Sequence, residues 1–368
     1  NALPAKTFGD AAFALTATAS SSLAVTYASS NTAVATVSGS TVTIVGAGSA
    51  NITASQAGNV SYNAATPVVQ PLTVNKKDQT ITFTALAAKA FGDAAFALAG
   101  TSNSGLAVTY TSSNPAVANV TGNMVTIVGV GSTNITASQT GNTNYNVATP
   151  VVQSLTVSNS TQTITFNALA AKTFGDAAFA LTATASSGLA VTYTSSNTTV
   201  AAVTGSTVTI VGVGSTNITA SQSGNGSFSA ATPVVQALTV NKKNQTITFA
   251  PLSAKAFGDA VFALAATASS TLGVTYVSSN LAVATVSGNT VTIVGVGSTN
   301  ITASQVGNTN YNAATPVVQA LTVNKAGQTI TFGTLASKTF GDASFLLTAT
   351  ASSSVGVTYV SSNTAVAT

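Results

Sequence analysis

Five residue types are missing from this 368-residue chain, which contains no histidine, cysteine, tryptophan, arginine or glutamate, and only 4% of its residues are charged. Histidine, cysteine and glutamate supply most of the general bases, thiol nucleophiles and transition-metal ligands that enzymes use. We therefore predict that the protein is not an enzyme, that it needs no cofactor, and that it has no catalytic, cofactor-binding or metal-binding site residues.

The chain also has little net charge. Its ten basic residues, all lysine, and its six acidic residues, all aspartate, leave a net charge of +4. Five lysines and five aspartates recur as pairs that cancel, and the other charged residues are Lys76, Lys77, Asp78, Lys242, Lys243 and Lys325. A nucleic-acid-binding surface requires a dense stripe of basic side chains. We therefore predict no nucleic-acid partner.

Disulfides and long apolar runs are missing as well. The absence of cysteine excludes a disulfide scaffold. Residues 94–171 carry no charge, but serine, threonine, asparagine and glycine interrupt every apolar run well before the roughly 18 consecutive apolar residues of a spanning helix. We predict no membrane insertion. The chain has no basic-then-apolar leader, so we expect any export signal to lie outside it.

What the sequence does contain is one unit repeated at a period of 83 residues. The segment VTIVGVGSTNITASQ is identical at Val125–Gln139, Val208–Gln222 and Val291–Gln305. The segment QTITF occurs at Gln79–Phe83, Gln162–Phe166, Gln245–Phe249 and Gln328–Phe332. Solenoid repeats have periods of about 20 to 50 residues, whereas a unit of this length matches a small autonomous domain.

Within one repeat the pattern indicates β-strands throughout and nothing has helical period. In the second repeat, Val125, Ile127, Ile135 and Ala137 alternate with threonines that we expect to face outward. The alternation breaks at Gln153–Ser154, where we predict a β-bulge. Turn signals every 8–12 residues then favour an antiparallel sandwich. Its seven expected strands cover residues 81–83, 96–100, 107–110, 116–120, 124–128, 133–139 and 151–157.

The period divides the chain into five parts. We expect a first repeat that lacks its opening strand, three complete repeats and a partial one, at 1–77, 78–160, 161–243, 244–326 and 327–368. Only four residues join consecutive repeats, and four extended residues reach at most about 14 Å. We therefore expect a stiff, linear string. Because Asn1 matches Thr84 in phase and Thr368 matches Thr36, we also expect the sequence to be a window on a longer chain.

The segment TYTSSNPAVANVTGNMVTIVGVGSTNITASQ, Thr109–Gln139, resembles the group 2 bacterial immunoglobulin-like (Ig-like) family. Members typically read W-S-S-N, then VATV, G-x-V and A-G-x-x-x-I-T-A. The resemblance covers essentially the whole chain and implies an all-β, linear array of seven-stranded antiparallel Ig-like sandwiches. It also implies a secreted bacterial protein at the cell surface and no catalytic residue. Tyrosine replaces the tryptophan frequent in the family at Tyr27, Tyr110, Tyr193, Tyr276 and Tyr359.

One charged pair recurs in every repeat, as Lys6/Asp10, Lys89/Asp93, Lys172/Asp176, Lys255/Asp259 and Lys338/Asp342. The leading interpretation is structural. The aspartate accepts backbone N–H bonds in a Gly-Asp turn, the lysine forms an ion pair with it, and Phe91 fills the core. Three alternatives stay open: a calcium site completed by asparagine and carbonyl oxygens, a Lys–Asn isopeptide bond, and a Ser–Lys dyad.

Three other motifs carry weaker signals. N-I-T matches the N-glycosylation sequon, but inside a predicted strand the pattern is more typical of plain polar/apolar alternation; it occurs at Asn51, Asn134, Asn217 and Asn300. The aromatic residue of GNxxY could stack on a sugar, although a phenylalanine in the series favours packing; it is Tyr62, Tyr145, Phe228 or Tyr311. The Gly129–Gly131 motif precedes a strand, so it is no nucleotide-binding loop.

These observations favour a structural component of an extracellular filament or cell-surface stalk. Uniform repeats offer the same surface at a constant step, as assembly from copies of one chain requires. The expected partners are other copies, end to end or lateral. The alternative is an adhesin repeat region that binds surface glycans or a protein of a host or neighbouring cell. A functional amyloid is a weaker hypothesis, because fixed turns and in/out alternation specify closed sandwiches.

Overall fold

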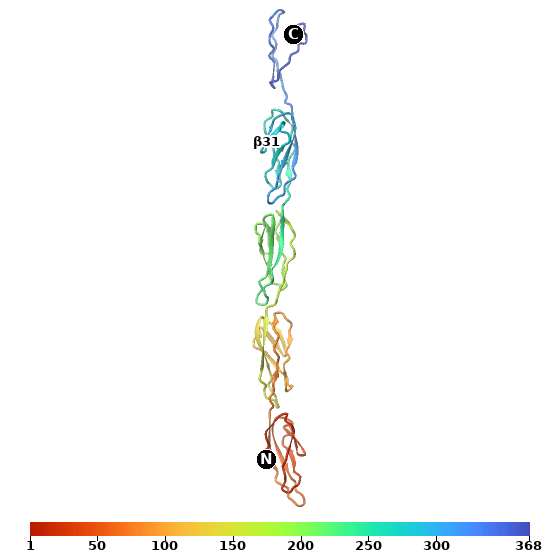
Figure 1. The fold of residues 1–368 in the computed structure, drawn as a ribbon, viewed down its shortest axis with the longest axis vertical. Helices are drawn as coiled ribbons and strands as arrows, with labels where there is room; N and C mark the ends of the chain where they lie inside the picture. The colour runs from red at the N-terminus through yellow and green to blue at the C-terminus, as the bar shows by residue number, and fades with distance from the viewer. The chain divides into compact units, whose positions relative to one another are not determined.

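The computed structural model describes residues 1–368 and contains strands, turns and loops but no helix. The chain divides into two compact units: residues 1–165 with 183–191 and 221–234, and residues 166–182 with 192–220 and 235–368. Within each complete repeat, Figure 1 shows strands that run side by side. The all-β prediction is confirmed.

The second repeat occupies all seven predicted strand positions and contains two additional short strands, so that it has nine strands in all. The first position yields β8, and residues 96–102 form β10 and β11 instead of one strand. A further strand, β9, was not predicted. The strands are β8 (Ile81–Thr82), β9 (Lys89–Ala90), β10 (Phe96–Ala97), β11 (Thr101–Ser102), β12 (Thr109–Ser112), β13 (Ala118–Thr121), β14 (Met124–Ile127), β15 (Gly131–Ser138) and β16 (Val151–Ser158).

These strands form a four-stranded sheet in the order β12-β15-β16-β9, a three-stranded sheet β10-β14-β13 and the pair β11-β8. All pairings are antiparallel except β16 with β9, where Val157 lies opposite Lys89 in a parallel register. This edge pair is the exception to the antiparallel pairing that the sequence predicts. The opening segment of the repeat passes from β8, which pairs with β11, to β9, at the edge of the four-stranded sheet. Strands that change sheet are common in sandwiches. In the four-stranded sheet, β9 runs parallel to the last strand, β16.

The third and fourth repeats have the same arrangement, and the first has it without equivalents of β8 and β11. The first contains β1 (Lys6–Thr7), β2 (Phe13–Ala14), β3 (Thr26–Ser29), β4 (Ala35–Ser38), β5 (Thr41–Ile44), β6 (Gly48–Ser55) and β7 (Val68–Asn75). The third contains β17 (Ile164–Thr165), β18 (Lys172–Thr173), β19 (Phe179–Ala180), β20 (Thr184–Ala185), β21 (Thr192–Ser195), β22 (Ala201–Thr204), β23 (Thr207–Ile210), β24 (Gly214–Ser221) and β25 (Val234–Asn241). The fourth contains β26 (Ile247–Thr248), β27 (Lys255–Ala256), β28 (Phe262–Ala263), β29 (Thr267–Ala268), β30 (Thr275–Ser278), β31 (Ala284–Ser287, labelled in Figure 1), β32 (Thr290–Ile293), β33 (Gly297–Ser304) and β34 (Val317–Asn324).

The core of each complete repeat lies between its sheets. In the second repeat, Val125, Ile135, Ala137 and Leu155 are fully buried, as the alternating pattern predicted for the first three. Burying one such large aliphatic side chain contributes about 1.5–3 kcal/mol to folding. Thr133 departs from the prediction that threonines face outward. It is buried because its hydroxyl bonds the Ser112 hydroxyl at 2.8 Å and accepts the Asn114 N–H at 2.9 Å.

The predicted bulge at Gln153–Ser154 was wrong. β15 and β16 pair without interruption, with Asn134 opposite Ser154 and Ile135 opposite Gln153. The alternation of inward and outward side chains continues through this segment, and Gln153 occupies an inward position. There its Nε2 donates to the backbone oxygen of Phe83 at 2.7 Å. A polar side chain with a backbone partner is tolerated in such a position.

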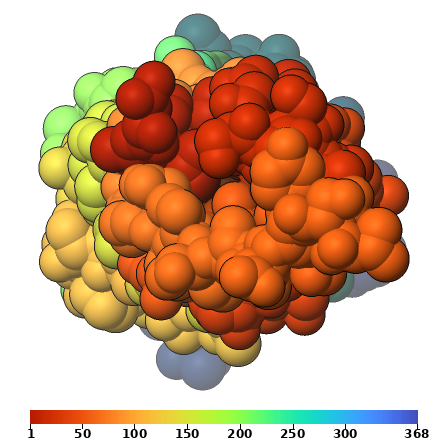
Figure 2. Space-filling view, turned by 90° about the horizontal axis from the view of Figure 1, so that it is seen from below, coloured from red at the N-terminus to blue at the C-terminus, as the bar shows by residue number.

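The two ends of the chain differ from the complete repeats. The first repeat has no strand equivalent to β8, and its β1 pairs in parallel with β7. Figure 2 shows this repeat in front, with its dark red N-terminal residues beside orange residues of its last loop and strand. Residues 327–368 form only β35 (Ile330–Thr331) and β36 (Thr350–Ala351), which pair with each other.

Candidate functional site: the joint between consecutive repeats

The segment that joins two repeats is bonded to a loop of the following repeat. Lys77 donates its backbone N–H to the Asn144 oxygen at 2.9 Å, and Asn146 donates its own to the Lys77 oxygen at 2.9 Å. Lys77 and Tyr145 thus form a parallel β-bridge. Equivalent bridges link Ser160 with Phe228 and Lys243 with Tyr311. Satisfied backbone groups on both sides restrict the torsion angles of the joining segment.

Two aromatic rings meet at each joint. Phe8, in the Phe-Gly-Asp turn of the first repeat, packs edge to face against Tyr145 of the second, with ring centroids 5.5 Å apart. The same contact joins Phe91 to Phe228 at 5.8 Å and Phe174 to Tyr311 at 5.6 Å. The expectation that Phe91 fills the core of its own repeat was therefore wrong. The GNxxY aromatic of the second, third and fourth repeats packs against the preceding repeat, in line with the phenylalanine in its series, whereas Tyr62 of the first is 54% exposed.

A side chain of the joining segment adds a further bond. Lys76 donates from Nζ to the backbone oxygen of Asn142 at 2.8 Å, and Asn159 donates from Nδ2 to that of Asn225 at 3.0 Å. The third joint repeats the lysine version, from Lys242 to Asn308 at 2.7 Å. Bonds with charged donors are stronger than neutral ones. Two of the charged residues outside the recurring pairs therefore serve to connect repeats.

The Gly-x-Gly loop of the earlier repeat also takes part at two of the three joints. Asn144 Oδ1 accepts the N–H of Ala47 at 2.9 Å, and Asn310 Oδ1 accepts that of Val213 at 3.2 Å. The second joint has Ser227 at the position of Asn144, and a serine side chain is shorter than an asparagine. The second joint therefore has an asparagine donor in place of the lysine, and no asparagine side chain that bonds the Gly-x-Gly loop.

The GNxxY loop is held in shape by its own side chains. Asn142 Oδ1 accepts the backbone N–H groups of Asn144 and Tyr145 at 2.8 and 2.9 Å. Gly141 has a φ of +73°, and a Cβ atom there would lie 2.4 Å from the Tyr145 oxygen. Asparagine and glycine are the residues that such a turn requires. Sequence reasoning identified the loop, but not that it faces another repeat.

The recurring lysine and aspartate do not form the predicted ion pair. Asp93 Oδ2 accepts the N–H of Ala90 at 3.0 Å, which confirms the turn-capping part of the prediction. The Lys89 ammonium instead lies over the ring of Phe96, 4.9 Å from its centroid. The other four lysines lie over Phe13, Phe179, Phe262 and Phe345 at 4.6–5.2 Å. Each charge thus has a local structural partner. The calcium, isopeptide and Ser–Lys hypotheses stay untested predictions.

The remaining motifs lie within the sandwiches. The sequon asparagines are exposed and lie within β6, β15, β24 and β33, as predicted. Gly129 lies in the loop before β15, where a Cβ atom would be 2.7 Å from the Ala116 oxygen. This close approach gives the Gly-x-Gly motif a packing role. No helix in the structure is long and apolar enough to cross a membrane.

No protein-family model and no curated protein matches the chain. Several solved structures do match it. The chain is 12% identical to Drosophila N-cadherin EC1-4, over 86% of this chain and 94% of that one, with a TM-score of 0.25. It is 12% identical to Sidekick-1 immunoglobulin domains 1-5, over 88% and 79%, with a TM-score of 0.27. It is 17% identical to surface layer protein SbsC, domains 1-6, over 83% and 51%, with a TM-score of 0.23. Each of these structures contains several domains in series.

Proposed function

We propose that this chain is a structural component of an extracellular filament or cell-surface stalk, built from Ig-like sandwiches of the group 2 bacterial type that are rigidly joined. The proposed division is 1–77, 78–160, 161–243, 244–326 and 327–368. The observation that carries the proposal is the joint: the same bridge and the same aromatic contact recur at all three. A fixed joint repeated at a constant interval is what a stalk or helical assembly needs.

The surface composition supports the same proposal. Charged residues make up only 4% of the chain, which leaves the outward faces rich in serine, threonine and asparagine, so that little repulsion keeps neighbouring chains apart. Copies of the same chain are therefore the proposed partners, end to end or side by side. The alternative, an adhesin repeat that binds glycans or a protein, requires a repeat with a distinct binding loop, and the repeats differ mainly by exchanges among alanine, threonine and valine.

The proposal is tested by electron microscopy of single chains. We expect consecutive sandwiches to be related by nearly the same rotation and translation at every joint. The variant Lys77→Pro removes the N–H that bonds the Asn144 oxygen and should broaden the distribution of angles at the first joint only. Asn75→Ala, beside the bridge but outside it, is the matched control. Unrelated angles at the joints of the unmodified chain would contradict the proposal.

A further inference from the structure

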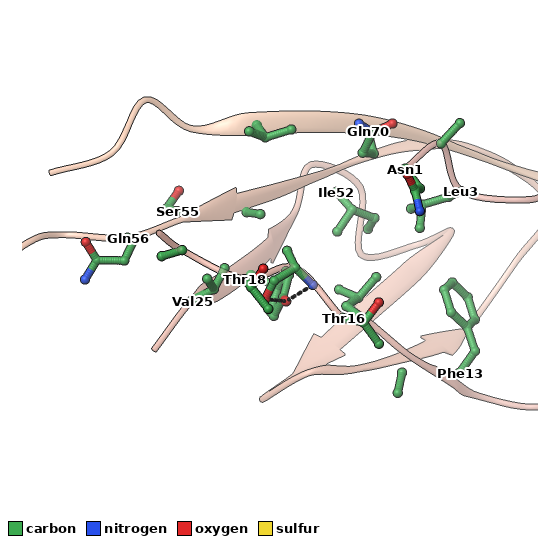
Figure 3. A pocket seen from close by; sticks show the side chains of 18 of the residues that line it. Asn1, Leu3, Phe13, Thr16, Thr18, Val25, Ile52, Ser55, Gln56 and Gln70 are labelled. Carbon is green, nitrogen blue, oxygen red and sulfur yellow. Dashed lines mark hydrogen bonds between the residues drawn. The ribbon is translucent and has the colours of Figure 1, made fainter. Parts of the chain in front are cut away.

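The repeats of this chain are of two alternating kinds. The residue after the recurring lysine is threonine in the first, third and fifth repeats and alanine in the second and fourth. A second position alternates in the same way, and its five residues are all exposed, so core packing does not impose the choice. They are Thr16, which lines the pocket shown in Figure 3, Ala99, Thr182, Ala265 and Thr348. The sequence therefore has a second period, of two repeats.

The joining segments alternate with the same period. Lys77 precedes the second repeat and Lys243 the fourth, whereas Ser160 and Ala326 hold this position before the third and fifth. The next residue carries a carboxylate or an amide only before the second and fourth repeats; in chain order it is Asp78, Thr161, Asn244 and Gly327. The first and third joints thus belong to one kind, and the second joint to another.

The GNxxY loops match the segments that precede them. The position of Asn144 holds asparagine in the second and fourth repeats and serine in the first and third. Asn144 accepts the Ala47 N–H at 2.9 Å in the first joint, and the third joint has the same kind of bond. Ser227, at this position in the second joint, makes no bond to the Gly-x-Gly loop. The second joint thereby lacks one hydrogen bond between repeats.

A second hydrogen bond is confined to the same two joints. In the first, Asn146 donates from Nδ2 to Asp78 Oδ1 at 2.7 Å. In the third, Asn312 donates to Asn244 Oδ1 at 2.8 Å. These bonds fasten the loop to the joining segment. The second joint has a serine and a threonine at these positions, and no hydrogen bond connects their side chains.

A lysine contact is also missing from the second joint. A Cβ atom on Gly9 would lie 3.5 Å from Lys77 Nζ, and one on Gly175 would lie 3.3 Å from Lys243 Nζ. Each ammonium therefore lies over the Phe-Gly-Asp turn of the preceding repeat, which carries an aspartate of opposite charge. At Gly92, the equivalent glycine of the second joint, nothing lies within 4 Å of that point.

All three joints nevertheless have the same backbone connection. Each has two N–H···O bonds of 2.9–3.0 Å between the joining segment and the loop, and each has one aromatic pair. The remaining side-chain bond of the second joint has a neutral donor, Asn159, in place of a lysine. The second joint is therefore closed in the same way as the others, but fewer and weaker side-chain contacts hold it closed.

We propose that the mechanical unit of this chain is a pair of repeats, and that the joint before the third repeat is a hinge between two pairs. One hydrogen bond changes an opening equilibrium by about two- to tenfold, and the lost contacts of one joint act together. The inference rests on the proposed function, because it assigns the bending of the proposed stalk to every second joint. Such a stalk yields at fixed intervals while its sandwiches stay folded, since local opening requires less free energy than global unfolding.

Hydrogen exchange in the unmodified chain tests the hinge, because the bridging amides of the three joints make equivalent backbone bonds. After correction for intrinsic rates, the Ser160 and Ser229 amides should exchange at least about fivefold faster than those of Lys77 and Asn146. The equivalent amides of the third joint should match those of the first. Equal protection at all three joints would overturn the hinge.

A first variant gives the second joint the side chains of the third. Ser160→Lys, Thr161→Asn, Ser227→Asn and Ser229→Asn together should slow exchange there to the rate of the other joints. Each substitution introduces a residue that the chain already carries at an equivalent position, so the loop can still form. Unchanged exchange in this variant would overturn the assignment of the hinge to these side chains.

The reverse variant, Asn144→Ser with Asn146→Ser, removes both side-chain bonds from the first joint. Exchange at Lys77 should accelerate at least about fivefold, while the third joint serves as the control and stays unchanged. No acceleration would mean that these bonds do not hold the joint closed, and the hinge would lose its physical basis.

The angles seen by electron microscopy separate this inference from the stalk itself. We expect nearly the same mean angle at all three joints, with a broader distribution at the second. Equally narrow distributions at the three joints would overturn the hinge and leave the stalk in place. Unrelated mean angles would contradict the stalk, whatever the rates of exchange.

Discussion

The rings of Phe91 and Phe228 lie with centroids 5.8 Å apart at an interplanar angle of 80°, although they belong to consecutive repeats. Each is carried by a turn that a glycine makes possible, Gly92 at a φ of +87° and Gly224 at +76°. The backbone bonds between Ser160, Ser227 and Ser229 lie beside them. The Phe-Gly-Asp turn of one repeat and the GNxxY loop of the next, both recognisable in the sequence, thus pack against each other at the joint.

The first prediction concerns this aromatic pair. Phe228→Ala should accelerate hydrogen exchange of the Ser160 and Ser229 amides, because edge-to-face pairs contribute about 0.5–1.5 kcal/mol beyond their buried area. A double-mutant cycle with Phe91→Ala should show coupling of that size. Exchange at Lys77 and Asn146, in the first joint, is the internal control. Additive effects of the two substitutions would mean that the rings do not stabilise the joint.

The second prediction concerns the recurring lysine. Lys89→Met should couple to Phe96→Leu by about 0.5–1 kcal/mol, the usual strength of a cation–π contact near the surface. Lys89→Met and Asp93→Asn should be additive, since the carboxylate bonds a backbone amide and not the ammonium. Stability is followed through the protected amides of β16. Coupling to Asp93 and none to Phe96 would restore the ion-pair hypothesis.

A third prediction concerns the buried glutamine. Gln79 Nε2 donates to Asn146 O at 2.6 Å and to Gln139, and Gln79 Oε1 accepts from the Ser102 hydroxyl at 2.8 Å. Gln79→Leu should destabilise the second repeat by about 2 kcal/mol, because buried partners would lose their bonds. Hydrogen exchange in β15 measures this loss. Gln328→Leu, at the exposed equivalent position, should have no such effect, and equal losses would show that burial is not the cause.

A fourth prediction separates two glycines with similar backbone angles. Gly92 has open space where a Cβ atom would lie, whereas at Gly141 that atom would be 2.4 Å from a backbone oxygen. Gly92→Ala should therefore cost only the strain of a left-handed residue, about 1–2 kcal/mol. Gly141→Ala should cost more and also loosen the bridge between Lys77 and Tyr145. Equal effects in hydrogen exchange would contradict this difference.

The last prediction addresses the isopeptide alternative. Because the Lys89 ammonium lies over an aromatic ring and not against an asparagine side chain, we expect the intact mass of the recombinant 368-residue chain to match the 35.9 kDa of its unmodified sequence. A loss of one ammonia per repeat would establish the cross-link and contradict the structural role that we assign to the lysine. The matched control is the Lys89→Met chain, whose mass should change only by the substitution.

The repeat length, the all-β class and most of each core follow from the amino-acid sequence alone. Period-2 alternation is a local property, so the pattern is enough to place Val125, Ile135 and Ala137 inside the sandwich. The hydrogen bond from the Ala90 N–H to the Asp93 carboxylate is equally predictable, because these two residues lie only three positions apart in the sequence.

The partners of many side chains, in contrast, depend on the folded arrangement, because the pattern can place such residues only on a loop or a face. The alternation at Gln153 looks broken in the sequence because its partner, the Phe83 oxygen, is 70 residues away. Lys89 contacts Phe96 and not Asp93 because strand geometry, not sequence spacing, brings the ring beneath the ammonium. Phe91 cannot be assigned to a joint from its own repeat, because the surface that it packs against exists only once the next repeat has folded.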